Sequence, residues 1–480
     1  MTTSTTPLAD GFEPATRADW LNLVAKTLKG AGAETLIGRT ADGLAVPPLF
    51  ALDDASPPLP VAAAPRTGDR GWDVRAVTAA PTATQANAEA LDALAGGAAS
   101  LLIRLDTGDG AGGVAVSSAD DLARALDKVL IDVSPIALDA GFLGPVAAGW
   151  LDDVAKAAPA APLALHLDPI TAFARAGASP GPIAAHVTTA AIAAARLAET
   201  YPKASLFLAT GSAAHEAGGS SAWELAMAAA AAVAYAKALS AAGLGLEAAF
   251  RSIVLGVALD AEPLTSIAKL RALRVIWARI TQACGVSHPA RIEARTSGRM
   301  LTRADRWTNL VRLTSAGFSG AVGGADALVL GTYSDAIGLP DALGLRMARN
   351  TQLILMEEAH LGRVADPAAG SWALETMTDD LARAAWAAFQ SIETAGGLAT
   401  ALEAGLIAEA VATGRNTLKA ALSDRSLRLI GVTDFASGEP APSAADAGAG
   451  LPAKIPDARL PGADSACPAL SPIRLEDLAQ

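Results

Sequence analysis

The chain has 480 residues, of which 51% are hydrophobic and 18% charged, so it can bury a large core and is not globally disordered. Its 49 acidic residues outnumber its 37 basic residues, and a net charge of −12 argues against a nucleic-acid partner. The two cysteines, Cys284 and Cys467, form no CxxC pattern, which excludes a disulfide scaffold and favours a reducing, cytoplasmic location. The longest apolar run, residues 225–236, is shorter than the ~20 residues that a bilayer requires, so we expect no membrane association.

Residues 1–60 are expected to form an N-terminal arm. Apolar residues at helical spacing, among them Trp20, Leu21 and Val24, predict a helix over residues 17–30. An extended stretch at residues 47–50 follows. The arm is too short to build its own core, so its apolar side chains must pack on the rest of this chain or on another chain.

Residues 61–433 alternate short apolar runs with long helical stretches, at intervals of roughly 30–45 residues that suit βα units. The predicted strands are residues 101–105, 136–138, 163–167, 206–209, 253–259, 292–296 and 328–330, with a weaker eighth candidate at 364–372. Eight such units predict an α/β fold of the TIM-type (β/α)8 barrel class, with a doubly wound open sheet as the alternative. Residues 434–480 are rich in Ala, Pro, Gly and Asp, which predicts a linker or tail.

Two motif matches lack the context that their chemistry requires. Residues 108–113 (GDGAGG) fit GxGxxG, but an apolar run follows and the next helix begins only after Ser118, so a flexible turn is favoured over a dinucleotide loop. His215 and Glu216 begin an HExxH pattern that Gly219 breaks, so the sequence predicts no zinc site. Residues 211–219 follow a predicted strand, which would place them at the carboxyl end of the barrel, where active sites of this fold lie.

Several segments resemble the methylmalonyl-CoA mutase family. The strongest are residues 346–355 (RMARNTQLIL), 366–372 (DPAAGSW), 268–274 (AKLRALR) and 308–312 (TNLVR). The resemblance extends over residues 20–432. It implies a barrel threaded along its axis by an acyl-CoA, and adenosylcobalamin held at the carboxyl face by a separate domain that supplies a histidine from a DxHxxG motif. The implied reaction, an isomerisation by intramolecular transfer, interconverts methylmalonyl-CoA and succinyl-CoA.

The chain departs from the family pattern at the positions that carry the chemistry. It contains no DxHxxG motif, so we expect no cobalamin domain in residues 434–480. The family's active-site tyrosine and histidine fall on Ser212 and Ala213, and a second tyrosine segment is missing before residues 70–75. We therefore predict no catalytic, cofactor-binding or metal-binding residue in this chain, and a lumen filled by side chains.

These departures predict the small (beta) subunit of a heterodimeric mutase, with adenosylcobalamin on the large (alpha) subunit. The resemblance implies that the arm, residues 1–60, reaches across to that partner. Two alternatives stay open: an active acyl-CoA mutase barrel served by a cobalamin domain on a separate chain, and a stand-alone acyl-CoA-binding protein.

Overall fold

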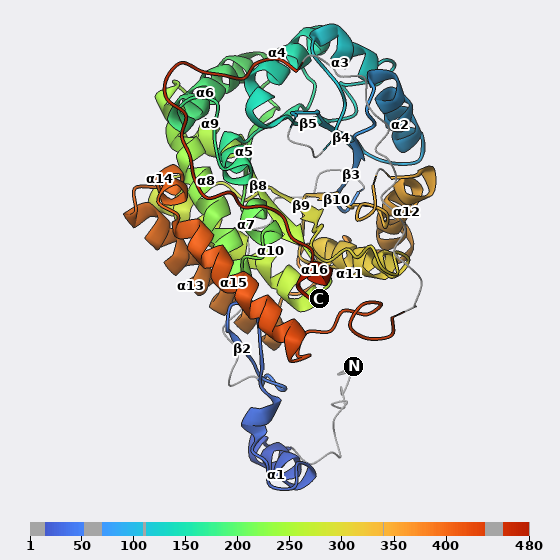
Figure 1. Cartoon of the computed structure of the whole chain (residues 1–480), viewed down its shortest axis with the longest axis vertical. Coiled ribbons are helices and arrows are strands. Elements are labelled where there is room, and N and C mark those ends of the chain that lie inside the picture. Colours follow the sequence, from blue (N-terminus) through green and yellow to red (C-terminus); the bar gives the residue numbers. More distant parts are fainter. Residues whose placement is uncertain (1–14, 52–69, 109–111, 339, 437–454, 480) are drawn as a thin grey trace, which may run out of the picture.

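A closed barrel of eight parallel strands forms the centre of the molecule, in the order β10-β3-β4-β5-β6-β7-β8-β9 (Figure 1). The computed structural model describes residues 15–51, 70–108, 112–338, 340–436 and 455–479. The barrel strands are β3 (Asp73–Thr78), β4 (Ser100–Arg104), β5 (Ile136–Asp139), β6 (Ala164–Leu167), β7 (Ser205–Thr210), β8 (Ile253–Leu259), β9 (Ile292–Thr296) and β10 (Ala327–Val329). The predicted TIM-type barrel is therefore confirmed.

Seven of the eight predicted strands are confirmed, and the candidate at residues 364–372 is wrong. Those residues form turns that lead into a helix, whereas the missing strand is β3. In β3, Asp73 and Arg75 alternate with Val74 and Ala76, so no continuous apolar run marks it. The alternation arises because Asp73 and Arg75 face ionic partners, while Val74 is buried in the main apolar core.

Helices surround the barrel and a second layer of helices covers one side of it. The surrounding elements are α2 (Ala83–Ala95), α3 (Ala119–Ala125), η3 (Gly141–Leu143), α4 (Gly144–Ala155), α5 (Pro169–Ala176), α6 (Ile183–Thr200), α7 (Ser212–Glu216), α8 (Ser221–Ala241), α9 (Leu246–Arg251), α10 (Pro263–Ala283), α11 (Thr308–Val322), α12 (Ala342–Leu353) and the π-helical turn η4 (Ile354–Glu358). The outer elements are α13 (Trp372–Thr394), α14 (Leu398–Glu403) and α15 (Leu406–Ser423). Helix α13 packs on α8 and α10.

Helix α8 is a core helix enclosed between the barrel and α13. It is the one helix in the described part of the chain that is long and apolar enough to span a membrane, and 67% of its apolar window is buried inside the protein. Most of its buried side chains are alanines, which let β7 and α13 approach closely on both sides. Burial between two layers explains its composition without a bilayer.

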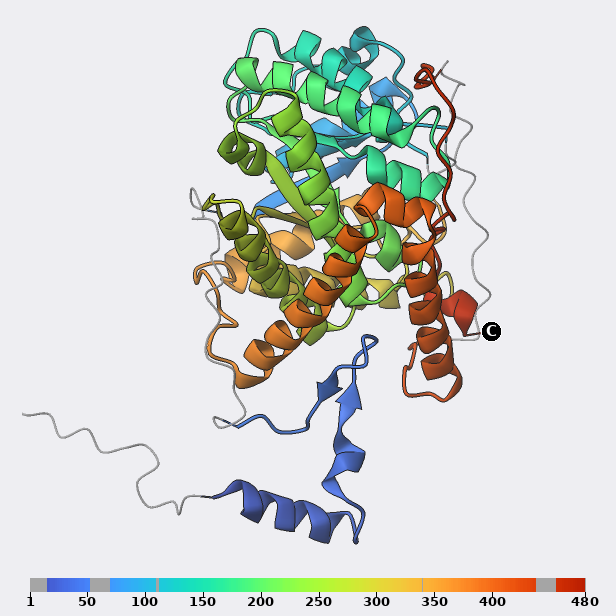
Figure 2. The ribbon, with the colours of Figure 1, turned by 90° about the vertical axis from the view of Figure 1, so that its left-hand side faces the viewer.

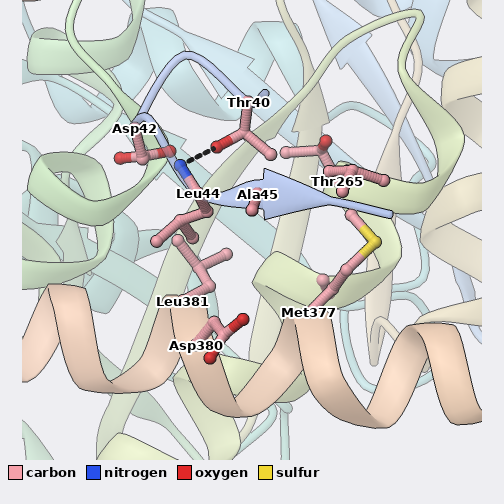
Figure 3. A pocket seen from close by; sticks show the side chains of 10 residues that line it. Thr40, Asp42, Leu44, Ala45, Thr265, Met377, Asp380 and Leu381 are labelled. Carbon is pink, nitrogen blue, oxygen red and sulfur yellow. Dashed lines mark hydrogen bonds between the residues drawn. The ribbon is translucent and has the colours of Figure 1, made fainter. Parts of the chain in front are cut away.

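The N-terminal arm divides into a hairpin that folds back and a helix that does not. The hairpin strands β1 (Gly38–Arg39) and β2 (Ala45–Val46) lie against α10 and α13, and Asp42 Oδ1 accepts a hydrogen bond from Ala222 N at the start of α8. Figure 3 shows Leu44, Met377 and Leu381 meeting there, and the remaining cavity of about 10 Å³ has room for at most one water. By contrast, helix α1 (Arg17–Thr27) and η1 (Ala33–Leu36) contain no buried residue and project away from the barrel (Figure 2).

Residues 455–479, which we call the strap, run across the carboxyl end of the barrel (Figure 1). Main-chain hydrogen bonds tie the strap to three segments of the rim: Cys467 N donates to Gly177 O (2.8 Å), Ile473 N to Glu216 O (2.8 Å) and Leu475 N to Arg299 O (2.9 Å). The strap ends in α16 (Leu475–Leu478). The sequence predicts a linker or tail here, and the described part of that segment is an ordered strap that fastens the rim of the barrel.

Replacing Leu470 tests whether the strap belongs to the folded unit. Leu470 is buried against the barrel core, and its N–H bonds Ala174 O (2.8 Å). We expect Leu470→Ala to lower the free energy of unfolding in urea by about 2–5 kcal/mol, whereas Leu343→Ala at an exposed position on α12 changes it little. Equal urea midpoints for the two variants would show that the strap is detached in solution.

Candidate functional site at the carboxyl end of the barrel

The two positions aligned with the family's tyrosine and histidine lie where the barrel predicts, directly after β7. Ser212 opens α7, donating its N–H to Thr210 Oγ1 (3.0 Å) and accepting a hydrogen bond from Arg175 Nη2 at its hydroxyl (3.2 Å). Ala213 is 1% exposed and packs in the core. A hydroxyl already bonded to an arginine and a buried methyl group offer neither an aromatic face nor an acid–base group at the mouth.

The glycine before this pair is required by close packing. A Cβ on Gly211 would lie 1.9 Å from Glu224 O, so α7 can approach α8 only with glycine at this position. Gly218 at the other end of the loop has φ +98°, a conformation that side chains disfavour, and Ile473 of the strap packs over it. Close packing at Gly211 and the positive φ of Gly218 therefore fix the backbone of the loop at residues 211–219.

His215 is not at the mouth but in a buried ionic cluster behind it. Its Nδ1 lies 3.1 Å from Glu224 Oε2, and Glu224 in turn accepts a hydrogen bond from Lys269 Nζ (2.8 Å). Arg299 bonds His215 O and Asp260 Oδ2, both at 3.0 Å. These groups join α7, α8, α10 and the ends of β8 and β9.

Burial and neighbouring charges set the charge states of Glu224 and His215 in that cluster. Burial opposes ionisation of Glu224, but Lys269 and His215 outweigh it and lower the pKa of Glu224 to about 2. Burial, helped by Arg299 and Lys269, lowers the pKa of His215, so the imidazole stays neutral at pH 7. The cluster therefore joins the segments that follow β7, β8 and β9, and the side chain of His215 is fully buried.

The barrel lumen is crossed by a second ionic network that the sequence reasoning missed. Arg75 on β3 pairs with Asp73 (2.7 Å) and with Glu293 on β9. Arg295 donates to Glu293 Oε1 (2.6 Å) and to Asp139 Oδ2 on β5 (3.0 Å). The sequence signal for this network is the alternation of charged and apolar residues in β3 and β9, because inward positions of a barrel strand recur every second residue.

Apolar side chains occupy another part of the lumen. Leu102, Ala137, Ala164 and Val329 form a cluster of their own inside the barrel, with Val77 packed against it. The ionic network is not fully buried, since the side chains of Arg295 and Asp139 are 25% and 30% exposed.

His166 adds an unusual group to this network. It lies in β6, where the register with β7 shifts between Ala164 and Leu167, and its φ of +46° belongs to the left-handed region. Its Nε2 is 3.7 Å from Glu293 Oε2, and neither ring nitrogen has a hydrogen-bond partner among the described residues. Burial lowers the pKa of His166 to about 4, although Glu293 opposes the shift.

Carboxylates of the same network remain ionised. Burial disfavours the charge on Glu293, but Arg295, His166 and Arg75 outweigh it and hold the pKa of Glu293 well below its usual range. For Asp139, Arg295 and Arg104 likewise overcome burial and lower the pKa to about 2. The carboxylates and guanidinium groups of this network therefore carry charges that compensate one another.

The motif segments that carry the family resemblance act as joints between helices. Arg271 on α10 is almost fully buried and bonds Asp366 (3.1 Å), Glu375 (2.8 Å) and Thr378 (3.1 Å), which fastens the loop before α13. In a further joint, Asn309 Nδ2 on α11 donates to Thr302 O (2.8 Å). The GxGxxG match at residues 108–113 lies partly outside the described residues; its described glycines open no helix, and α3 begins eleven residues after Gly108, at Ala119.

Stability should depend on pH through His166. Its folded pKa of about 4 lies below the unfolded value of 6.5, so the unfolded chain binds the extra proton and stability falls as the pH drops from 6.5 to 4. We expect His166→Gln to reduce the slope of unfolding free energy in this window by up to about 1.4 kcal/mol per pH unit. His360→Gln, at an exposed histidine, is the control. An unchanged slope in His166→Gln would contradict the assignment.

Comparison with known proteins agrees with the resemblance. The sequence model of the methylmalonyl-CoA mutase family matches residues 67–447. A protein of Streptomyces virginiae named methylmalonyl-CoA mutase small subunit is 37% identical over 92% of this chain and 75% of its own length. The small subunit of Propionibacterium freudenreichii subsp. shermanii is 34% identical over 84% of this chain and 66% of its own length. The methylmalonyl-CoA mutase of Escherichia coli K12 is 28% identical over 81% of this chain and 60% of its own. The chain belongs to the methylmalonyl-CoA mutase family.

Proposed function

We propose that this chain is the small subunit of a methylmalonyl-CoA mutase and that it is non-catalytic, supporting a large subunit that binds adenosylcobalamin. The observation that carries the proposal is the pair Ser212 and Ala213, a bonded hydroxyl and a buried methyl in place of the family's tyrosine and histidine. The names of the relatives from Streptomyces and Propionibacterium support the subunit assignment. The isomerase activity would then belong to the complex.

Adenosylcobalamin supplies the radical chemistry of this family, and the residues present here do not fit it. The 480 residues contain no DxHxxG motif to ligate cobalt. At the carboxyl end, the strap bonds the loops at Gly177, Glu216 and Arg299. Removing one preorganised donor from such a site typically costs a factor of ~10²–10³ in rate, and here the aromatic group and the histidine are both replaced. We derive no catalytic step through this barrel.

The ion pairs across the lumen support the same proposal for the acyl-CoA. Arg75, Glu293 and Arg295 meet across the axis along which the family's substrate would thread. Arg75 and Glu293 are buried and compensate each other, so an acyl chain that separated them would leave a buried charge unpaired. The unpaired cysteines, Cys284 and Cys467, fit the cytoplasmic location that we propose for the complex.

Co-expression with a mutase large subunit tests the function. We expect a 1:1 complex by gel filtration with light scattering, and isomerisation of succinyl-CoA with adenosylcobalamin only in the complex. The isolated chain should retain no corrin absorbance after gel filtration. Ser212→Ala should leave kcat of the complex within about twofold, because no transition-state contact is removed.

Three results would contradict this assignment. A large loss of kcat in an intact Ser212→Ala complex would restore a catalytic role for this barrel. Stoichiometric corrin retention by the isolated chain would contradict the placement of the cofactor. Micromolar binding of succinyl-CoA to the isolated chain by calorimetry would favour an acyl-CoA-binding protein.

The projecting helix α1 should contribute to the complex. Leu21 and Leu23 are exposed on a helix without a buried residue, and the hairpin that follows is anchored on this chain's own barrel through Asp42. Deleting residues 1–30 should weaken the complex at least tenfold in Kd and leave the circular dichroism of the barrel intact, since the hairpin is retained.

Matched point variants separate this effect from general surface changes. Leu21→Ser with Leu23→Ser should weaken the complex, whereas Leu130→Ser with Val133→Ser, in an exposed loop after α3, should not. If both pairs bind the large subunit as the unaltered chain does, α1 has no part in the contact.

A further inference from the structure

The loop between α5 and α6 pairs with the strap along its main chain. Cys467 N donates to Gly177 O (2.8 Å) and Ser465 N donates to Gly181 O (3.3 Å). In the opposite direction, Ser179 N donates to Ser465 O (3.0 Å). Donors and acceptors thus alternate between the two segments, as they do in an antiparallel strand pair. Bonds of this kind recognise an extended main chain, whatever its side chains are.

Two glycines of this loop allow the strap to approach closely. A Cβ on Gly177 would lie 2.9 Å from the Cβ of Ala469, and a Cβ on Gly181 would lie 2.5 Å from Leu460 O. Both glycines also have positive φ values, +74° and +102°, which side chains disfavour. A side chain at Gly181 would push the strap outward, because the atom it meets belongs to the main chain of the strap. We call residues 177–181 the rim edge.

The strap has few buried side chains to hold it. Leu470 and Glu476 are the only buried residues of the strap, all of whose residues the structure describes. Leu470 packs on the barrel core, and the carboxylate of Glu476 accepts the N–H of Arg303 (2.9 Å). A segment with few buried apolar contacts and many main-chain bonds near solvent opens at a lower free energy than the core. Detachment of the strap should therefore cost less than unfolding of the barrel.

We infer that the rim edge is a docking site for an extended peptide and that the strap of the same chain is its detachable occupant. The strap fits this site because Ala469 and Leu460 lie against its two glycines and its main chain completes the pairing. When the strap opens, the carbonyls of Gly177 and Gly181 become available to another extended segment, as at any exposed strand edge. This docking site does not depend on the proposed function.

Amide hydrogen exchange of the full chain tests whether the strap opens separately. The amides to follow are those that bond the barrel: Cys467, Leu470, Ile473 and Leu475. We expect their protection factors to be similar to one another and about tenfold or more below that of Leu255, whose N–H bonds Arg291 O inside the barrel. Strap amides protected as strongly as Leu255 would show that strap and barrel open only together, which overturns the inference.

Gly181→Ala tests the rim edge itself. The added methyl group meets Leu460 O, so we expect the protection of the strap amides to fall about tenfold or more. Gly243→Ala is the matched control, because Gly243 has almost the same φ (+101°) and nothing within 4 Å of its Cβ position. Both variants carry the same backbone strain. Equal protection of the strap in the two variants therefore overturns the inference.

A fluorescent peptide with the sequence of residues 455–479 tests docking from solution. In the full chain with Leu470→Ala, the resident strap is weakened and the rim edge is unaltered. We expect saturable binding by fluorescence anisotropy, and about tenfold weaker binding when Gly181→Ala is added. Absence of saturable binding overturns the docking site.

Light scattering separates the strap of the same chain from that of a second copy. We expect no dimer that depends on the rim edge. A stable dimer of the unaltered chain that Gly181→Ala abolishes would assign the edge to the strap of a second copy, which overturns the inference. None of these measurements involves the large subunit, so their failure leaves the proposed function standing.

Discussion

The interior of this barrel depends on one buried carboxylate, that of Glu293. It pairs with Arg75 from β3 and Arg295 from its own strand, and His166 from β6 lies beside it. Removing a buried charge of this kind leaves its partners uncompensated, which is far more costly than losing a surface ion pair. One carboxylate thus links strands β3, β6 and β9 across the interior of the barrel.

The residues that carry the family resemblance and the residues that would carry its chemistry play different parts. Arg271, with Asp366 and Glu375, holds the outer helix layer to the barrel, and it does so away from the carboxyl mouth. At the mouth itself, Ser212 and Ala213 are packed and bonded within this chain. Packing and catalysis use different side chains, so a resemblance carried by such joints does not by itself show a catalytic site.

The two ends of the described chain differ in how closely they pack on the barrel. The strap is fixed by main-chain hydrogen bonds to three segments of the carboxyl rim, and the side chain of its own Leu470 is buried against the barrel core. Helix α1 leaves apolar side chains in water, although the hairpin behind it is firmly anchored by Asp42 on α8. The arm therefore has an anchored base and an exposed tip.

The sequence by itself determined the barrel class, seven of its strands and the family, because apolar runs, helix periods and motif letters are local signals. It misplaced the eighth strand, because Asp73 and Arg75 make β3 look polar until the barrel closes and turns them toward Glu293. It also left the position of His215 open, because only the packing of α7 on α8 puts that ring behind the mouth. Ion pairs such as Arg75 with Glu293 join residues more than 200 positions apart. Only tertiary structure could decide them, since no local pattern records which inward-facing charges meet across a lumen.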